Sequence, residues 1–288
     1  MPPRPGFVPL SGGFPENSLK YFLPFAHLIY TIAFDSPGRP FHETMAKLLV
    51  SSIFRTGFSG DVLVLTNSPH RLFDNRRRNL SEMSFDTSKI SPSGLGAEAQ
   101  RFKFGAREFI NVKKYDRIMF VDCDCLCLSN PDGMLTGDEV IAYSQETFTK
   151  ITEPGNNAYL DDGEMEQLDS PGINSGIWWV KATHFGEVLT AWERIDARPP
   201  CREKGFGEQP AWVRFLLDTP LPRRTFLYDQ DVKYPLLEKR VAMDADDCVI
   251  QHFCGVWKTT DKLKHLYAAY VRRFHAESVF GMLTWLDG

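Results

Sequence analysis

The apolar residues of this chain fall into two patterns, continuous runs and runs spaced like one face of a helix. Residues 26–34 (AHLIYTIAF) and 61–66 (DVLVLT) are continuous runs of the kind found in strands that are buried on both faces. Between them, apolar residues recur with a helical period over residues 41–55, and Gly57 follows as a helix-ending residue. The pattern therefore predicts a strand, a helix and a second, parallel strand, which is the opening of an α/β fold.

A third apolar run, residues 118–121, stops at two carboxylates, Asp122 and Asp124. Ligands bind outside the carboxyl ends of strands in open α/β sheets, so we expect both acids at the ligand-binding edge. Buried carboxylates need a partner, and Mg²⁺ or Mn²⁺ is the simplest partner for two of them. The pattern favours a metal site that also carries substrate phosphates; a chance Asp-x-Asp in a surface turn is the competing interpretation.

The rest of the chain continues the alternation of helices and strands. We predict helices over residues 98–114, 182–195, from 208 onward and from 261 onward, and strands over 139–143, 171–180 and 247–253. Residues 1–24 are rich in proline and glycine and are expected to be an irregular lead-in. The acidic stretch 145–170 is expected to be a flexible loop that could act as a lid.

Composition sets the outer limits of the function. The chain has 288 residues, which is ample for a buried core, and a formal net charge of −4, which argues against a nucleic-acid-binding surface. No apolar run approaches the roughly 18 residues that a membrane span needs, and the proline-rich start does not resemble a signal peptide. We therefore expect a soluble, cytoplasmic protein without a membrane span.

The six cysteines do not indicate a zinc site. Cys123, Cys125 and Cys127 alternate along the chain, so they point to one face of an extended segment, and Cys-x-x-Cys pairs are absent. We predict that they are small apolar core residues in a reducing compartment.

Four polar motifs follow one another at the ends of predicted elements. They are Asp122-x-Asp124, Asn174-Ser175-Gly176, Glu208-Gln209 and the run HFCGVWK from His252 to Lys258. In this order they resemble the motifs of the glycogenin-like glycosyltransferases (glycosyltransferase family 8), which have the GT-A fold, and the resemblance covers residues 26–260. It implies an α/β fold with a mixed, mainly parallel central sheet flanked by helices. It also implies one domain over residues 25–288, with a nucleotide-binding half over about 25–130, an acceptor half over about 131–260 and C-terminal helices over 261–288.

The resemblance implies a metal site and a donor substrate. Asp122, Asp124 and His252 would hold Mn²⁺, with Mg²⁺ as an alternative, because Mn²⁺ accepts both carboxylate and imidazole ligands. The donor would be a UDP-sugar, either UDP-glucose or UDP-galactose.

The resemblance also assigns residues to the parts of the donor. Tyr30, Thr31 and Ala33 would contact the base and ribose. The family has a lysine that opens the helix before the metal motif; Lys103 is its best match, with Arg101 as a rival. Cys123 lies between the metal ligands, and Asn174 and Ser175 would face the sugar. Gly255 would let the backbone approach the diphosphate, and Lys258 would bind it. Asp169 is a further candidate for a sugar contact.

The implied reaction is hexose transfer with retention at the anomeric carbon. The metal and Lys258 would stabilise charge on the leaving diphosphate. Glu208 and Gln209 would lie at the reacting face, although this chain has glutamate where the family has aspartate. Gln209 could stabilise the transient sugar cation through its side-chain carbonyl, and the leaving phosphate would help to deprotonate the acceptor.

Several questions stay open at this level. The acceptor could be a carbohydrate, a protein or a small molecule, self-glycosylation would need a mobile tyrosine such as Tyr159, and an oligomer is compatible with the sequence. A non-catalytic sugar-nucleotide-binding protein is one alternative. A haloacid dehalogenase-type phosphohydrolase is another, but that family has Thr or Val where this chain has Leu126.

Overall fold

The computed structural model describes residues 26–36, 38–73, 78–88, 90, 94–202, 207–228, 230–235, 248–254 and 259–274. The predicted lead-in of residues 1–24, the candidate residues Gly255 and Lys258, and the predicted C-terminal helix beyond Phe274 lie outside the described residues.

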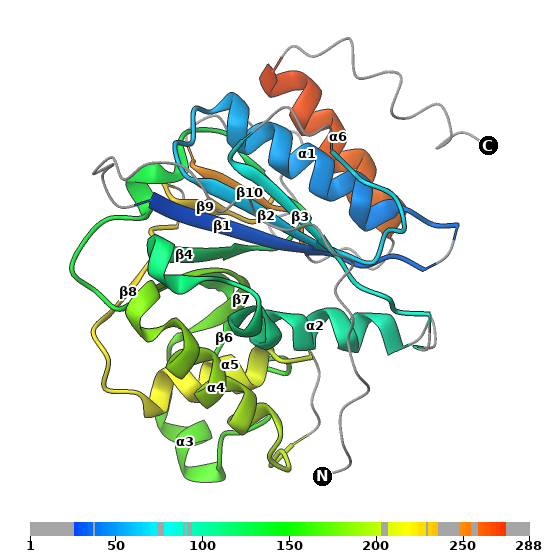
Figure 1. Cartoon of the computed structure of the whole chain (residues 1–288). Coiled ribbons are helices and arrows are strands. Elements are labelled where there is room, and N and C mark those ends of the chain that lie inside the picture. The colour runs from blue at the N-terminus through cyan, green and yellow to red at the C-terminus, as the bar shows by residue number, and fades with distance from the viewer. Residues whose placement is uncertain are drawn as a thin grey trace.

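A seven-stranded sheet crosses the middle of the molecule (Figure 1). Its strands, in spatial order, are β3 (Leu80–Ser84), β2 (Asp61–Thr66), β1 (Ala26–Ala33), β4 (Tyr115–Val121), β7 (Pro171–Lys181), β6 (Ile141–Lys150) and β8 (Arg223–Thr225). β7 runs antiparallel to its neighbours β4 and β6, and the other neighbouring pairs are parallel. The sheet is therefore mixed and mainly parallel, as predicted.

A second, three-stranded sheet lies beside the carboxyl end of β4. Its strands are β5 (Cys125–Cys127), β10 (Ile250–His252) and β9 (Val232–Lys233), with β10 in the centre. β10 pairs antiparallel with β5, and the register places His252 opposite Cys125. This pairing brings a residue from near the end of the chain next to the segment that follows β4.

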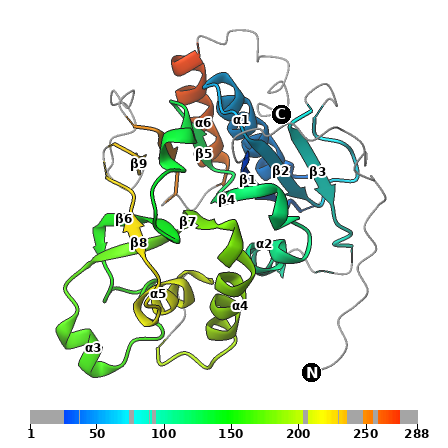
Figure 2. The same ribbon diagram turned by 60° about the vertical axis from the view of Figure 1, so that its left-hand side comes forward.

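Helices cover both faces of the large sheet (Figure 1). α1 (Phe41–Arg55) and α6 (Thr259–Phe274) pack side by side on one face, as Figure 2 also shows. α2 (Leu95–Gly105), α4 (Phe185–Asp196) and α5 (Gln209–Asp218) lie on the other face, and the short α3 (Asp162–Gln167) lies beyond them. Among the described residues, no helix combines the length and the apolar character that crossing a bilayer requires.

The alternating side chains of β1 explain why the sheet has two cores. Ile29 and Ala33 pack with the α1 and α6 side, whereas Leu28 and Tyr30 pack with the α2, α4 and α5 side. Because successive side chains of a strand point to opposite faces, a continuous apolar run can fill both cores. The predicted strand, helix and parallel strand at the start of the fold are confirmed, with Ile29 paired to Val62.

The predicted helix over residues 98–114 is wrong in its extent. α2 begins at Leu95 and ends at Gly105, and two short 3₁₀ helices, Ala106–Glu108 and Val112–Lys114, follow it. The side-chain oxygen of Asn111 accepts a hydrogen bond from the Lys113 N–H, a local bond that competes with helix continuation.

The flexible loop predicted over residues 145–170 is also wrong. β6 extends to Lys150, and α3 begins after Asp161 in a capping box, in which Asp161 and Glu164 each accept a hydrogen bond from the other's backbone N–H. Ala158 and Leu160 are buried, so apolar contacts hold this segment against the body of the protein.

The predicted core position of Cys123, Cys125 and Cys127 is confirmed. All six cysteines are free thiols, and four of them, Cys123, Cys125, Cys127 and Cys248, are buried. Burial raises the pKa of the Cys125 thiol well above its usual value, so this side chain behaves as a small apolar group.

Candidate active site

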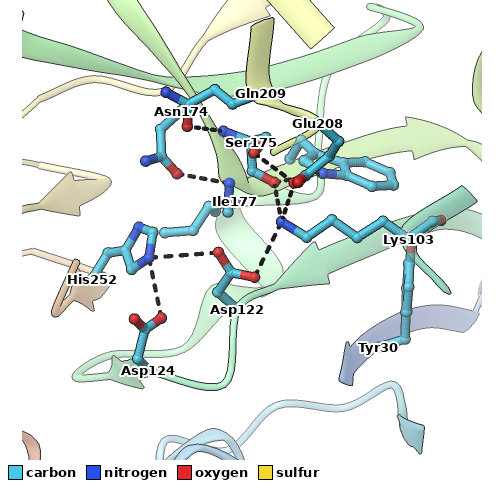
Figure 3. A network of polar contacts seen from close by, with 12 residues as sticks. Tyr30, Lys103, Asp122, Asp124, Asn174, Ser175, Ile177, Glu208, Gln209 and His252 are labelled. Atoms are coloured by element: carbon cyan, nitrogen blue, oxygen red, sulfur yellow. Dashed lines mark hydrogen bonds and ion pairs between the residues drawn. The ribbon is translucent and has the colours of Figure 1, made fainter. Parts of the chain in front are cut away.

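The two carboxylates that end β4 meet a histidine from β10 (Figure 3). The Asp122 N–H donates to the Gly176 carbonyl at 2.8 Å, and the Phe253 N–H donates to the Asp124 carbonyl at 2.9 Å. These hydrogen bonds fix the backbone of both aspartates. His252 Nε2 lies 3.2 Å from Asp124 Oδ1 and 3.7 Å from Asp122 Oδ2. Three groups that can bind a metal therefore converge at the sheet edge where ligands were predicted to bind.

The pKa values of the two aspartates are shifted in opposite directions. Burial opposes ionisation of Asp124, but Lys262 and His252 outweigh it and hold the pKa of that carboxyl well below its usual value. Burial, opposed by Lys103 and reinforced by Asp124, raises the pKa of the Asp122 carboxyl. An added cation between Asp122 and His252 would stabilise the ionised form of Asp122.

Gly176, on β7, leaves the space in which these groups meet. A Cβ at this position would overlap Asp122 Oδ2 and His252 Cε1 and would lie 2.8 Å from Asn174 Oδ1. The glycine of the Asn-Ser-Gly motif is therefore required by close approach rather than by backbone conformation.

We expect Gly176→Ala to lower Mn²⁺ affinity by at least about tenfold, because the methyl group would push Asp122 away from His252, a loss of about 1.4 kcal/mol or more. Isothermal titration with Mn²⁺ measures this. Gly186→Ala is the matched control, since a Cβ there meets no atom within 4 Å. Equal Mn²⁺ affinity in both variants would contradict the proposed role of Gly176.

Lys103 lies in the last turn of α2, not at a helix start as the resemblance implied, and it connects Asp122 to the residue before α5. Its Nζ lies 2.7 Å from Glu208 Oε1 and 3.3 Å from Asp122 Oδ1, and it donates to the Ser175 carbonyl at 3.4 Å (Figure 3). The ammonium also lies 4.7 Å from the centre of the Phe120 ring. Burial opposes the charge, but the two carboxylates outweigh it and raise the pKa of Lys103, so the side chain is a buried cation. Its side chain is 9% exposed.

The start of α5 is bonded to the same strand, β7. Glu208 Oε1 accepts from the Ser175 hydroxyl at 3.0 Å, and Gln209 Oε1 accepts from the Ser175 N–H at 3.3 Å. The Trp192 indole donates to the Glu208 carbonyl at 3.1 Å. The predicted helix start at Glu208-Gln209 is confirmed, and these bonds place both side chains beside Ser175.

Asn174 is held by a carboxylate that the sequence did not indicate. Its Nδ2 donates to Glu146 Oε1 at 2.6 Å, and its Oδ1 accepts from the Gly176 N–H at 2.7 Å. Glu146 is buried on β6 and also accepts from the Thr149 hydroxyl at 3.0 Å. These contacts fix which way the Asn174 amide faces.

Lys262 is a second residue that the sequence did not indicate. It lies in the first turn of α6, and its Nζ is 2.5 Å from Asp124 Oδ2. No recognised motif includes this position, and only the packing of α6 on α1 brings it to the site.

Other predicted site residues are placed differently. Tyr30 and Ala33 have no exposed surface, and the Tyr30 hydroxyl donates to the Lys103 carbonyl at 3.2 Å. Thr31 is also buried, and its hydroxyl has no hydrogen-bond partner among the described residues. Contact of these three residues with a base or ribose stays a prediction.

Residues predicted for the sugar and acceptor side lie as follows. Asp169 forms an exposed ion pair with Lys150, and its contact with a sugar stays a prediction. Tyr159 is buried, and its hydroxyl donates to the Asp196 carbonyl at 3.1 Å, so it is not the mobile tyrosine that self-glycosylation needs. Arg101, the rival of Lys103, is exposed, and Lys103 is the residue that reaches Asp122.

The side chains present fit a divalent metal ion. Ligand atoms of Asp124, Cys125 and His252 lie within 4.8 Å of one another. Burial raises the pKa of the Cys125 thiol, and a thiol binds metals as the thiolate, whereas carboxylate and imidazole ligands suit Mn²⁺. Asp122 therefore suits this ion better than Cys125 as the third ligand. Which residues bind an ion stays a prediction.

Comparison with known proteins shows the fold. No protein-family model matches the sequence, and no curated protein matches it. A solved structure of the bifunctional glycosyltransferase WbbM without ligand has a TM-score of 0.57 and 15% identity, and the match covers 92% of this chain and 53% of that chain. This chain thus spans about half the length of WbbM.

Two further structures cover their own chains more fully. The galactosyltransferase LgtC in complex with donor and acceptor sugar analogues has a TM-score of 0.50 and 11% identity, over 84% of this chain and 95% of that chain. Mouse xyloside xylosyltransferase 1 without ligand has a TM-score of 0.54 and 12% identity, over 80% and 98%. These similarities confirm the predicted α/β fold of the GT-A glycosyltransferase type, and at such identities they establish the fold alone.

Proposed function

We propose that this protein is a glycogenin-like glycosyltransferase that transfers a hexose from a nucleoside-diphosphate sugar to an acceptor, with retention and with a divalent metal. UDP-glucose and UDP-galactose are the proposed donors. The observation that carries the proposal is the convergence of Asp122, Asp124 and His252 at the carboxyl end of β4. The GT-A type of fold supports it, because ligands of open α/β sheets bind at this edge.

Three side chains would hold the metal, and Lys103 would position one of them. Asp122, Asp124 and His252 are the proposed ligands, and the bound ion would stabilise charge on the leaving diphosphate. Lys103 is buried and ion-paired to both Asp122 and Glu208, so it keeps the Asp122 side chain in place. In the proposal, Gly255 and Lys258 contact the diphosphate; both lie outside the described residues.

The sugar would lie against the start of α5 and β7. Asn174 and Ser175 are proposed to face the hexose. Glu146 fixes the amide of Asn174, and Glu208 accepts from the hydroxyl of Ser175, so both side chains are held in one orientation. The Glu208 carboxylate is engaged by Lys103, so we assign it a positioning role rather than that of a nucleophile. Gln209 is proposed to stabilise the transient sugar cation, and the leaving phosphate to accept the acceptor's proton.

An assay of donor turnover tests this proposal. The protein is incubated with UDP-glucose or UDP-galactose, with Mn²⁺ or with a chelator, and proton NMR follows UDP release and the anomer of the first product. We expect Mn²⁺-dependent release and a product of the donor's own α configuration. UDP binding without any sugar transfer or hydrolysis would indicate a non-catalytic binding protein, and a β product would exclude retention.

A further inference from the structure

The lysine that reaches Asp124 from α6 is held in place by its helix. Leu263 and Leu266 of α6 are fully buried, and the Tyr270 hydroxyl is 2.6 Å from the Ser51 hydroxyl of α1. Lys262 therefore projects from a fixed turn, and its side chain is 20% exposed. Its ammonium pairs with a carboxylate that is only 12% exposed, so Lys262 is more than a solvated surface charge.

Lys262 pairs with the second carboxylate oxygen of a proposed metal ligand. Asp124 presents Oδ1 to His252 and Oδ2 to the Lys262 ammonium. A lysine ammonium and a divalent cation compete for the same carboxylate lone pairs, and their like charges repel. A metal ion that binds both oxygens of Asp124 therefore requires the Lys262 ammonium to move away, and one that binds Oδ1 alone is still repelled by it.

Lys103 provides the contrast within the same site. It pairs with Asp122 and, at 2.7 Å, with Glu208, and its side chain is 9% exposed. Moving it away would break two ion pairs in a buried region. Lys262 is more exposed, and within the described part of the chain its ion pair is with Asp124 only. A flexible four-carbon side chain with one such partner can move away without breaking any other described ion pair.

We propose that Lys262 is a tethered counter-ion that competes with the divalent metal for Asp124. It pairs with Asp124 when the metal is absent and is displaced when the metal binds. This inference rests on the proposed metal site. It means that the metal-free protein keeps its buried carboxylate paired, and that metal affinity is lower than the ligands would otherwise give.

Direct titration of the chelator-treated protein with Mn²⁺ tests the inference. We expect Lys262→Met to bind Mn²⁺ roughly tenfold or more tightly than the wild type, because a charge-assisted hydrogen bond no longer has to be broken. Lys262→Arg keeps the charge and should bind no more tightly than the wild type. Lys264→Met is the matched control, since Lys264 is exposed on the same helix, and it should leave the affinity unchanged.

Thermal stability provides a second readout that does not depend on turnover. Without metal, Lys262→Met should melt below the wild type, because Asp124 loses its partner, and Mn²⁺ should raise its melting temperature by more than that of the wild type. If Lys262→Met does not fold, Lys262→Gln, which keeps a hydrogen-bond donor without the charge, takes its place in both measurements.

The outcomes separate the two proposals. Equal or weaker Mn²⁺ binding by the uncharged variants, with measurable binding by the wild type, would overturn the counter-ion role and leave the metal site standing. Absence of Mn²⁺ binding in every variant and in the wild type would overturn both.

Discussion

Replacing Asp124 with Asn is expected to reduce metal-dependent turnover of the UDP-sugar by at least about 100-fold. The variant keeps the shape of the side chain and removes the charge that faces His252 and Lys262. A metal ion contributes several kcal/mol of charge stabilisation, and each 1.4 kcal/mol corresponds to about a factor of ten in rate. The rate of UDP release at saturating Mn²⁺ measures the loss.

The control for this variant is Asp138→Asn, which removes an exposed carboxylate elsewhere in the chain. It should retain the wild-type rate. Wild-type turnover by Asp124→Asn, with the same dependence on Mn²⁺, would remove Asp124 from the metal site and with it the proposed chemistry.

Replacing Lys103 with Met is expected to reduce the free energy of unfolding by about 3–5 kcal/mol, the usual cost of removing one partner of a buried ion pair. The variant leaves the Glu208 carboxylate without its cation in a region where that side chain is only 5% exposed. It also removes the ammonium that neutralises Asp122. Urea unfolding in the absence of metal measures the change.

Two comparisons identify the cause of that loss. Arg101→Met removes a positive charge from the exposed side of the same helix and should cost less than about 1 kcal/mol. Adding Glu208→Gln to Lys103→Met should restore part of the stability, because the unpaired charge is then gone. A double variant that is as unstable as the sum of its single variants would show that the two side chains do not interact.

The parts of the site that the sequence predicted are those that depend on strand ends. The apolar run of β4 stops at Val121, so Asp122 had to lie at the sheet edge, and a strand that ends in His252 could add the histidine. Glu208 and Gln209 were predictable because Pro210 marks the first turn of a helix. These features are local, and each can be recognised from a few neighbouring residues.

The parts that the sequence did not predict depend on long-range packing. Lys262 is 138 positions from Asp124, and Glu146 is 28 positions from Asn174. On the sequence, the first is one lysine of a polar helix face and the second one acid of an acidic stretch. Only the packing of α6 on α1 and the pairing of β6 with β7 bring them to the site.

Local chemistry would have corrected one wrong prediction. Asp161 and Glu164 have the spacing of a capping box, which marks a helix start inside the stretch that was predicted to be a loop. The acidic composition of the stretch favours a loop, whereas this local spacing favours a helix start. Burial of Ala158 and Leu160, which holds the segment in place, is a tertiary effect that composition does not indicate.

The central claim is that the site binds a nucleoside diphosphate through a metal ion, and thermal stability tests it most directly. The protein is heated with UDP, GDP or CDP, each with and without Mn²⁺. A ligand at about 100 times its dissociation constant should add roughly 2.7 kcal/mol, a shift of a few degrees. The proposal predicts stabilisation by UDP only when Mn²⁺ is present; a folded protein that responds to none of the nucleotides, with or without Mn²⁺, would contradict it.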